Sequence, residues 1–400
     1  MSLTFVAHNT LEPAIYGAMA GVLASQRGVE LAHLNVEWDT QRYADACQHV
    51  TAAGDLVTSG LLWYERLSGK SAGRVWQLDD LLSLHGAKDW IIPLGPSQLA
   101  SFTRLAREVR NYSVDYQLVE VEHSRQGYQF HRLDSLDGAP NTWWRDSFGR
   151  FTQRHHTQQS SSSRRLRIAL IGTYQDQLES YPATLASLGD AAEAQGTLTE
   201  IVFIPPRSSE HVLQSTLKDI DGVILPGGSD MQNVAGQIRV AHYCLKHGIP
   251  TLGLCLGMQT MATAVIQQMS GDTQANLAEA DPQAAVKTFI PLGETAGRSL
   301  HRLGDNVMKM RSGSQIASIL GERSTIRYNH RFQLNPQFKD SLENYGLAIS
   351  ATCLDGAIAD GIEYASHPFY VAVQGHPELT STSENPHPLM RAFLQAAADA

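Results

Sequence analysis

The sequence predicts an α/β protein with two domains, the second built on a mostly parallel β-sheet. Beyond residue 166, short runs of Val, Ile and Leu alternate with amphipathic segments of helical period. This pattern is typical of parallel strands that helices cover on both faces. The chain has 400 residues, of which 42% are hydrophobic and 18% charged, enough for two globular domains that each bury a core.

A polar stretch separates the two domains. Residues 154–165 read Arg-His-His-Thr-Gln-Gln-Ser-Ser-Ser-Ser-Arg-Arg and have no apolar periodicity, which is typical of a flexible connector. We therefore predict a divergent, smaller α/β domain over residues 1–150, a linker over 151–166 and a second domain over 167–400. An anion-binding role for the linker's Arg and His side chains is the less favoured alternative.

The N-terminal domain is expected to alternate strands and helices. Strands are predicted over residues 3–6, 29–32 and 89–93, and a helix over 14–26. The turn after the first strand, residues 7–13, has neither the glycines nor the Lys-Ser/Thr pair with which a phosphate loop wraps a triphosphate. The sequence therefore gives no evidence for a nucleotide site of that type.

The C-terminal domain has the clearer pattern. Strands are predicted over residues 168–172, 200–204, 222–225, 251–254, 348–351 and 370–373, and helices over 181–194, 235–246, 258–269 and 388–398. In parallel sheets, functional groups gather at the carboxyl ends of the strands. The residue that directly follows the strand over 251–254 is therefore the first candidate for chemistry.

That residue is Cys255. It lies in Gly253-Leu254-Cys255-Leu256-Gly257, and glycines two residues to either side allow the sharp strand-to-helix turn of a nucleophile elbow. The helix that follows places unpaired N–H groups and a positive dipole end beneath the sulfur, which favours the reactive thiolate.

A histidine and a carboxylate near the C-terminus complete a possible triad. His376 and Glu378 flank Pro377, so an imidazole can pair with the thiolate while the carboxylate orients its other nitrogen. The alternative is an inert buried cysteine and an unrelated surface histidine. Because both motifs are intact, we favour the Cys-His-Glu triad.

Charge and cysteine content exclude several function classes. The formal net charge of -9 gives no general reason to expect nucleic acid or an anionic membrane as a partner. The four cysteines include no C-x-x-C pair, so we expect neither a disulfide framework nor a metal site. No signal peptide or membrane span is evident in the sequence, and a reducing cytoplasm is the expected location.

Several motifs beyond the elbow carry a specific family resemblance. They are Leu225-Pro226-Gly227-Gly228, residues 275–279 (Ala-Asn-Leu-Ala-Glu), 301–304 (His-Arg-Leu-Gly), 327–332 (Arg-Tyr-Asn-His-Arg-Phe) and 376–382 (His-Pro-Glu-Leu-Thr-Ser-Thr). With them, the C-terminal domain resembles the class I (triad) glutamine amidotransferases, and most closely the glutaminase domain of the CTP synthase family. The resemblance implies a flavodoxin-like fold.

It also implies a role for individual residues. Cys255 would attack the side-chain amide of L-glutamine to form a γ-glutamyl thioester, while the N–H groups of Gly228 and Leu256 hold the oxyanion. His376 would protonate the departing ammonia and then activate the water that releases glutamate. The residues implied to bind glutamine are Gly227, Gln259, Glu279 and Arg331, and no metal is implied.

The N-terminal domain resembles the amidoligase half of CTP synthase more faintly. Without the phosphate loop, we expect neither ATP and Mg²⁺ binding in the family manner nor ATP-driven CTP formation. Ammonia would then pass to an acceptor in this domain or to a partner synthetase, and we expect a homo-oligomer. Two alternatives remain open: a γ-glutamyl hydrolase, and a non-catalytic regulatory or scaffold protein.

Two departures from the family pattern bear on the site. Residues 229–232, Ser-Asp-Met-Gln, stand where the family carries an aromatic and Arg-containing stretch linked to activation by GTP. Gly375 replaces a bulky residue directly before His376. We expect this second change to widen or loosen the pocket.

Overall fold

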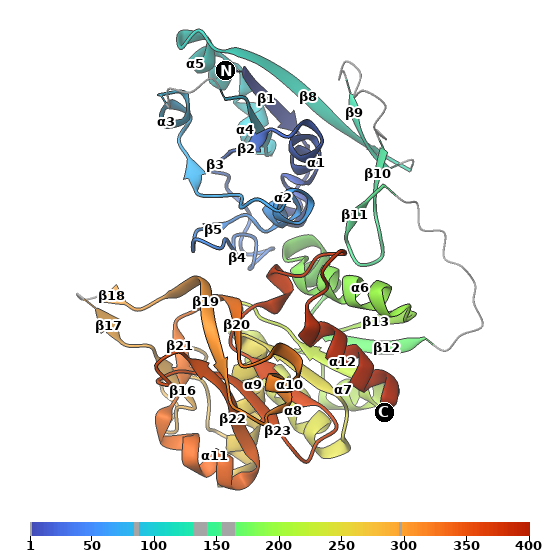
Figure 1. Ribbon diagram of the computed structural model, residues 1–400, viewed down its shortest axis with the longest axis vertical. Helices are drawn as coiled ribbons and strands as arrows, with labels where there is room; N and C mark the ends of the chain where they lie inside the picture. The colour runs from blue at the N-terminus through green and yellow to red at the C-terminus, as the bar shows by residue number, and fades with distance from the viewer. Residues whose placement is uncertain (1, 84–87, 126, 132–141, 154–164, 296–297) are drawn as a thin grey trace. The chain divides into compact units, whose positions relative to one another are not determined.

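The computed structural model describes residues 2–83, 88–125, 127–131, 142–153, 165–295 and 298–400 (Figure 1). The chain forms two compact units, one made of Met1–Ser161 with Gln175–Ala186 and the other of Ser162–Tyr174 with Ser187–Ala400. Most of the predicted linker, residues 154–164, lies outside the described residues. The domain boundaries inferred from the sequence therefore stay a prediction.

The first unit contains a seven-stranded sheet in the order β11-β10-β9-β8-β1-β7-β2. Strands β2, β7, β1 and β8 are mutually parallel, and β8 to β11 continue as antiparallel pairs. The strands are β1 (Ser2–Ala7), β2 (Glu30–Leu31), β7 (Trp90–Leu94), β8 (Asp115–Ser124), β9 (Gly127–His131), β10 (Thr142–Arg145) and β11 (Phe151–Thr152).

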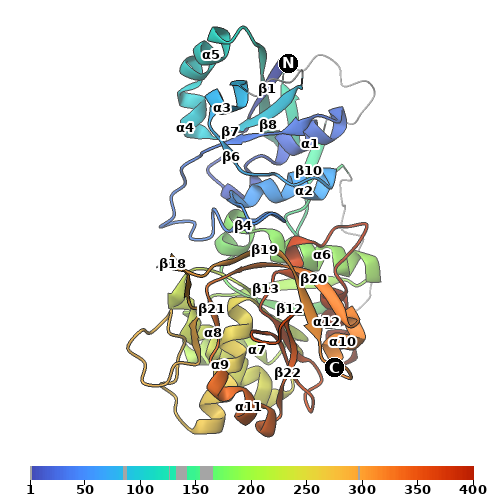
Figure 2. The same cartoon turned by 60° about the vertical axis from the view of Figure 1, so that its left-hand side comes forward.

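Short elements complete this unit. Two small pairs join β3 (His33–Leu34) to β6 (Val75–Trp76) and β4 (His49–Val50) to β5 (Leu56–Val57). The helices are α1 (Ala18–Arg27), α2 (Leu62–Ser68), α3 (Leu78–Ser83), α4 (Pro96–Ala100) and α5 (Phe102–Asn111). Helices α1 and α2 lie side by side in both views (Figures 1 and 2) and contact each other.

The first helix begins later than its sequence suggests. The predicted helix over residues 14–26 is divided into a 3-10 turn, Pro13–Ile15, and helix α1, which starts at Ala18. Gly17 between them has a left-handed backbone with φ of 77°, a conformation that glycine adopts without a steric penalty. A Cβ at this position would lie 2.8 Å from Leu61 Cδ2. Both the backbone conformation of Gly17 and its close packing against Leu61 therefore require glycine where the helix is interrupted.

The second unit is built on a nine-stranded sheet in the order β13-β12-β14-β15-β24-β23-β22-β19-β20. Strands β13 to β24 in this order are parallel, and the remaining neighbours are antiparallel. The strands are β12 (Leu166–Ile171), β13 (Thr199–Ile204), β14 (Gly222–Leu225), β15 (Thr251–Leu254), β19 (Arg302–Met310), β20 (Arg323–His330), β22 (Leu347–Cys353), β23 (Ala359–Tyr364) and β24 (Tyr370–Val373).

Helices surround this sheet, and two small pairs lie beside it. The pairs join β16 (Phe289–Pro291) to β21 (Phe332–Leu334) and β17 (Glu294–Thr295) to β18 (Arg298–Ser299). The helices are α6 (Ala183–Gln195), α7 (Glu210–Leu217), α8 (Val234–His247), α9 (Leu256–Ser270), α10 (Gln315–Leu320), α11 (Lys339–Tyr345) and α12 (Pro388–Asp399).

Helix α9, which follows Cys255, is deeply buried. Every residue from Leu256 to Ile266 is buried, and the helix contacts α8, α11 and strands β14, β15, β23 and β24. A helix that is apolar on all sides belongs in a protein interior. The core therefore holds the N-terminal end of α9 firmly against the carboxyl ends of β14 and β15.

The predicted fold class is confirmed, since the protein is α/β and its larger sheet is parallel over the strands that lead to the site. The antiparallel half of this sheet was not predicted for β19, β20 and β23. In strand β19 only Gly304, Met308 and Met310 are buried, so the strand carries neither a continuous apolar run nor strict alternation. Among the described residues, no helix is long and apolar enough to cross a membrane.

Candidate active site

Cys255 lies at the turn between β15 and α9. It has φ of 49° and ψ of -103°, and only one other non-glycine residue in the described part of the chain, Ser113, has a positive φ. Such a backbone costs on the order of 1–3 kcal/mol and persists only where its surroundings impose it. Here the Cys255 N–H donates to the Val373 carbonyl at 2.9 Å, and its carbonyl accepts from Gln259 N–H at 3.2 Å.

Glycines allow the close approaches that this turn requires. A Cβ at Gly257 would lie 1.9 Å from the Leu225 carbonyl oxygen, and one at Gly253 would lie 2.5 Å from Met261 Sδ. Neither position can carry a larger residue without movement of its neighbours. The elbow inferred from the glycine spacing is therefore present in the backbone.

Gly227 lies against two of the predicted catalytic residues. A Cβ there would lie 3.0 Å from His376 Cε1 and 3.5 Å from Cys255 Cβ. The turn after β14, the cysteine and the histidine therefore meet at one place.

His376 and Glu378 form a buried pair. The His376 Nδ1 lies 2.7 Å from Glu378 Oε1, and the exposed fractions of the two side chains are 8% and 0%. The His376 N–H donates to the Arg327 carbonyl at 2.7 Å, which ties the segment to β20. Ser381, a few residues further on, donates to the buried carboxylate of Asp190 at 3.0 Å. The ring is thereby fixed from both its backbone and its carboxylate partner.

The electrostatic environment of His376 favours its charged form. Burial acts to lower the pKa of His376, but the negative charges of Cys255 and Glu378, with hydrogen bonding to both, raise this pKa well above its ordinary value. Among the described residues, His376 Nε2 has no hydrogen-bond partner of ordinary geometry. We therefore attribute the influence of Cys255 mainly to charge. The arrangement can hold a thiolate beside an imidazolium.

Two further groups contact the sulfur. Gln374 Nε2 lies 3.5 Å from Cys255 Sγ, and Sγ lies 3.7 Å from the Asn329 carbonyl oxygen. Asn329 Oδ1 in turn lies 2.8 Å from His301 Nε2. Asn329 and His301 lie within the sequence motifs, but the motifs assign no role to them and do not include Gln374, because a linear pattern does not show which side chains point at the sulfur.

Gln259, predicted to bind substrate, lies one helical turn after Cys255. Its side chain is buried, and its Nε2 donates to Gln374 Oε1 at 3.4 Å. Its Oε1 is buried without a hydrogen-bond partner in the described part of the structure. A buried acceptor of this kind is costly unless a ligand or water satisfies it. Gln259 is therefore placed to accept from a bound polar molecule.

Glu279 and Arg331 are brought together by the small sheet of β16 and β21. The Ala278 N–H, adjacent to Glu279, donates to the Phe289 carbonyl of β16 at 3.0 Å, and Leu292 N–H donates to the Arg331 carbonyl at 2.9 Å. Desolvation raises the pKa of the Glu279 carboxyl, and the charge of Arg331 acts in the opposite direction. Glu279 and Arg331, which are predicted to bind the ammonium and carboxylate groups of glutamine, therefore lie close enough to influence each other's charge.

The predicted oxyanion donors lie at the ends of neighbouring strands. Leu225 at the end of β14 pairs with Gly253 of β15, so Gly228 and Leu256 follow adjacent strand ends. Leu256 is the first residue of α9, and the first N–H groups of a helix have no partner within it. The Leu256 N–H is therefore left without a partner inside α9, directly after Cys255 in the chain.

The expectation that Gly375 widens the pocket is wrong on the side where its side chain would point. A Cβ at Gly375 would lie 2.8 to 3.0 Å from three carbon atoms of Ile326. Ile326, on β20, thus fills the space that a bulky residue would need. The small residue at position 375 is therefore matched by the larger side chain of Ile326 on the neighbouring strand.

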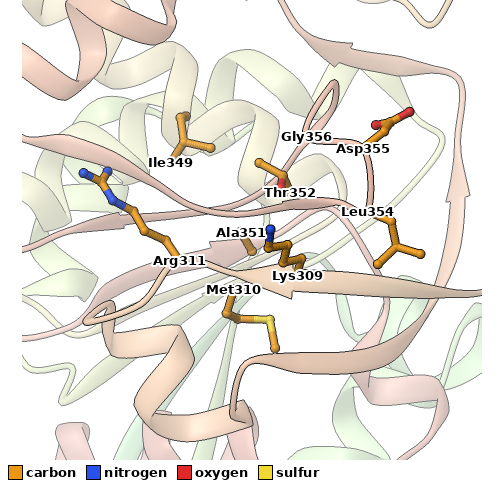
Figure 3. Close-up of a pocket in the computed structure, with 9 residues that line it drawn as sticks. All are labelled: Lys309, Met310, Arg311, Ile349, Ala351, Thr352, Leu354, Asp355 and Gly356. Carbon is orange, nitrogen blue, oxygen red and sulfur yellow. The ribbon is translucent and has the colours of Figure 1, made fainter.

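A separate pocket of about 190 Å³ lies at the β19 and β22 strands (Figure 3). It contains none of the predicted site residues. It is lined by Lys309, Met310, Arg311, Ile349, Ala351, Thr352, Leu354, Asp355 and Gly356. Arg311 is already engaged by the carboxylate of Glu343 at 2.8 and 2.9 Å.

No group of three or more His, Cys, Asp or Glu residues that could hold a metal ion occurs among the residues described.

Comparison with known proteins identifies the family. The family model described as glutamine amidotransferase class-I matches residues 181–396. The chain belongs to this family. As a class I glutamine amidotransferase it is an enzyme, as the sequence predicted. It is 34% identical to a CTP synthase of Saccharopolyspora erythraea over 253 residues, covering 59% of this chain and 44% of that protein.

Two other relatives support the same placement. A CTP synthase of Deinococcus radiodurans is 32% identical over 324 residues, which cover 75% of this chain and 58% of that protein. The glutaminase domain of Trypanosoma brucei CTPS, solved with bound acivicin, matches with a TM-score of 0.56 and 25% identity over 58% of this chain and 94% of that one. The chain spans about half the length of the CTP synthases that it matches.

Proposed function

We propose that this amidotransferase hydrolyses L-glutamine to glutamate and ammonia through Cys255, His376 and Glu378. The observation that carries the proposal is the strained backbone of Cys255, at φ of 49°, beside the buried pair in which His376 Nδ1 lies 2.7 Å from Glu378 Oε1. A backbone strain of this kind at a strand-to-helix turn serves a nucleophile that must stand clear of the sheet.

The reaction would proceed in two steps. The Cys255 thiolate attacks the side-chain amide carbon of glutamine, and the C–N bond breaks as the imidazolium of His376 gives its proton to the departing ammonia. Water, deprotonated by the now neutral His376, then attacks the thioester and releases glutamate and the thiolate. The N–H groups of Gly228 and Leu256 would stabilise the oxyanion in both steps, by about 3 kcal/mol per donor.

Substrate binding would rest on the remaining predicted residues. Arg331 suits the α-carboxylate of glutamine, since a guanidinium can grip a carboxylate through two parallel hydrogen bonds. Glu279 suits the α-ammonium group, and the Oε1 of Gln259, which has no hydrogen-bond partner among the residues described, can accept from the substrate. Gly227 leaves the space between Cys255 and His376 open. Together these groups suit the amino-acid end of L-glutamine.

Mutation of Cys255 tests this proposal. We expect Cys255→Ala to abolish glutamate release from glutamine, measured by coupled oxidation of glutamate, while Cys353→Ala retains it. Cys353 is half-buried and its Sγ lies 2.9 Å from Asp355 Oδ1, away from the predicted site residues. Glutamate release at the normal rate from purified Cys255→Ala protein would refute the proposal. A higher kcat/KM for γ-glutamyl amines or peptides than for glutamine would instead favour a γ-glutamyl hydrolase.

We also propose that the N-terminal unit does not bind ATP in the manner of a phosphate loop. The turn after β1 is packed against its own domain: a Cβ at Gly60 would lie 2.4 and 2.5 Å from the carbonyl oxygens of Tyr16 and Pro13. Trp63 Nε1 donates to the Ala14 carbonyl at 2.7 Å. This packing fixes residues 13–16, which directly follow the turn after β1.

Ammonia would therefore pass to an acceptor in the N-terminal unit that does not depend on such a loop, or to a partner synthetase. We also propose that the protein forms a homo-oligomer. Glutamate release should be measured with and without ATP and UTP, with a mass-spectrometric search for an aminated product. Formation of CTP from UTP would refute the proposal for the N-terminal unit. Glutamate release that persists without nucleotide would argue against a purely regulatory or scaffold protein.

A further inference from the structure

The side chain of Gln374 contacts the sulfur that the mechanism needs, and neither the family motif nor the triad gives it a task. It is fully buried at the end of β24, two residues before His376. Its N–H donates to the Asp360 carbonyl at 2.9 Å, which anchors the backbone to the strand β23. The direction of the side chain is therefore fixed by the sheet.

The carboxamide of Gln374 joins two neighbouring residues. Its Nε2 lies 3.5 Å from Cys255 Sγ, and its Oε1 accepts from Gln259 Nε2 at 3.4 Å. Because Gln259 also lies on α9, one turn after Cys255, the carboxamide is held by the same helix that carries the nucleophile. The acceptor side of Gln374 is satisfied by Gln259, so its N–H side is left for the sulfur.

The groups that contact the sulfur act in opposite directions. The Asn329 carbonyl oxygen, 3.7 Å from Sγ, can accept from a thiol but repels the negative charge of a thiolate. An N–H donor from Gln374 and the N-terminal end of α9 stabilise that charge. The ionisation of Cys255 thus depends on which neighbour the sulfur interacts with.

We propose that Gln374 donates a hydrogen bond to the Cys255 thiolate and holds the sulfur in its reactive, ionised form. This inference rests on the proposed function for its purpose, since a thiolate is needed to attack glutamine. Its physical content is independent, because the ionisation of Cys255 can be measured without glutamine.

The test is the pH dependence of alkylation of Cys255 by iodoacetamide, followed by mass spectrometry of the peptide that contains it. Gln374→Met keeps the length and apolar bulk of the side chain and removes the donor. We expect the alkylation rate to fall roughly tenfold at pH values below the half-maximal pH of both proteins, since hydrogen bonds to charged groups are among the stronger ones. The pH of half-maximal rate should rise by about one unit.

Gln374→Glu provides a second variant that retains an acceptor for Gln259. It places a carboxylate beside the sulfur, so the half-maximal pH should rise further than in Gln374→Met. Gln267→Met is the matched control: its Nε2 donates to the carbonyls of Thr273 and Ala275 at 3.1 and 2.8 Å at the far end of α9. It should alter thermal stability without moving the alkylation profile.

The opposite result would overturn the proposal. If the carboxamide accepts from the thiol, its removal will lower the half-maximal pH in Gln374→Met, and if it has only a packing role, the Gln374→Met profile will stay unchanged. Should Gln374→Met not fold, Gln374→Ala, which also removes the donor without adding a charge, replaces it in the test. Normal alkylation behaviour in a protein that releases no glutamate would count against the proposed function and leave the role of Gln374 standing.

Discussion

The pair of His376 and Glu378 allows a quantitative prediction for the substitution Glu378→Gln. The substitution keeps the shape of the side chain and removes its charge. In the structure the two side chains are buried and joined by a contact of 2.7 Å. A hydrogen bond to a charged group in such a setting contributes about 1.5–3 kcal/mol. At 1.36 kcal/mol per factor of ten, we expect kcat for glutamate release to fall roughly 10- to 150-fold.

The pH profile should change in a defined direction. In the native protein, burial acts to lower the pKa of His376, and the charges of Cys255 and Glu378 raise it well above its ordinary value. A raised pKa means that the imidazolium persists, with its contribution to activity and stability, until the pH rises through that value. With the Glu378 charge removed, the imidazolium is lost at a lower pH. The alkaline limb of the kcat profile should therefore move to lower pH.

The assay is glutamate release over pH 6 to 10, at several glutamine concentrations. KM should change little, because the predicted ligands Glu279 and Arg331 lie on other segments. Glu343→Gln is a matched control, since Glu343 pairs with Arg311 at the surface, at 2.8 Å. If Glu378→Gln protein retains both the native kcat and the native alkaline limb, the proposed orienting role of Glu378 is wrong.

Two further predictions concern packing and buried charge. Gly375→Phe should lower the melting temperature, and the added substitution Ile326→Ala should restore most of the loss, because the atoms of Ile326 lie within 3.0 Å of the new Cβ; no recovery in the double variant would contradict this account. Asp360→Asn should destabilise the fold by about 3–5 kcal/mol in urea unfolding, since it leaves the buried guanidinium of Arg302 without its charge partner. A loss below about 1 kcal/mol, as expected for an exposed pair, would show that the charge of Asp360 is dispensable.

The sequence predicted the parts of the site that depend on local spacing. Gly253 and Gly257 flank Cys255 at fixed distances along the chain, and a strand followed by a helix admits few geometries for such a turn. The parallel strands were recognisable because both of their faces are buried and their apolar runs are continuous. In both cases the constraint lies within a few consecutive residues.

Other features depend on contacts between distant segments. Gln374 and Gln259 are brought together by β24 and α9, and the filling of space beside Gly375 depends on Ile326 of β20. A single sequence shows that Gly375 lacks a side chain, but it does not show which distant residue occupies the vacated volume. Because protein interiors are closely packed, a small residue in one strand is commonly matched by a larger neighbour in another.

The two units retain different parts of the family's chemistry. In the C-terminal unit, the costly features of a hydrolytic site are retained together: a strained cysteine backbone, a buried His376–Glu378 pair and the buried Oε1 of Gln259 without a partner among the described residues. The strained backbone and the buried acceptor each lower the stability of the fold, so a chain without glutamine chemistry would gain stability by losing them. In the N-terminal unit, the turn after β1 is instead packed by Gly60 and Trp63, which favours stability over phosphate binding. The C-terminal unit therefore keeps the groups that glutamine hydrolysis needs, whereas the N-terminal unit does not keep a phosphate loop. Ammonia release is the activity that the retained groups support.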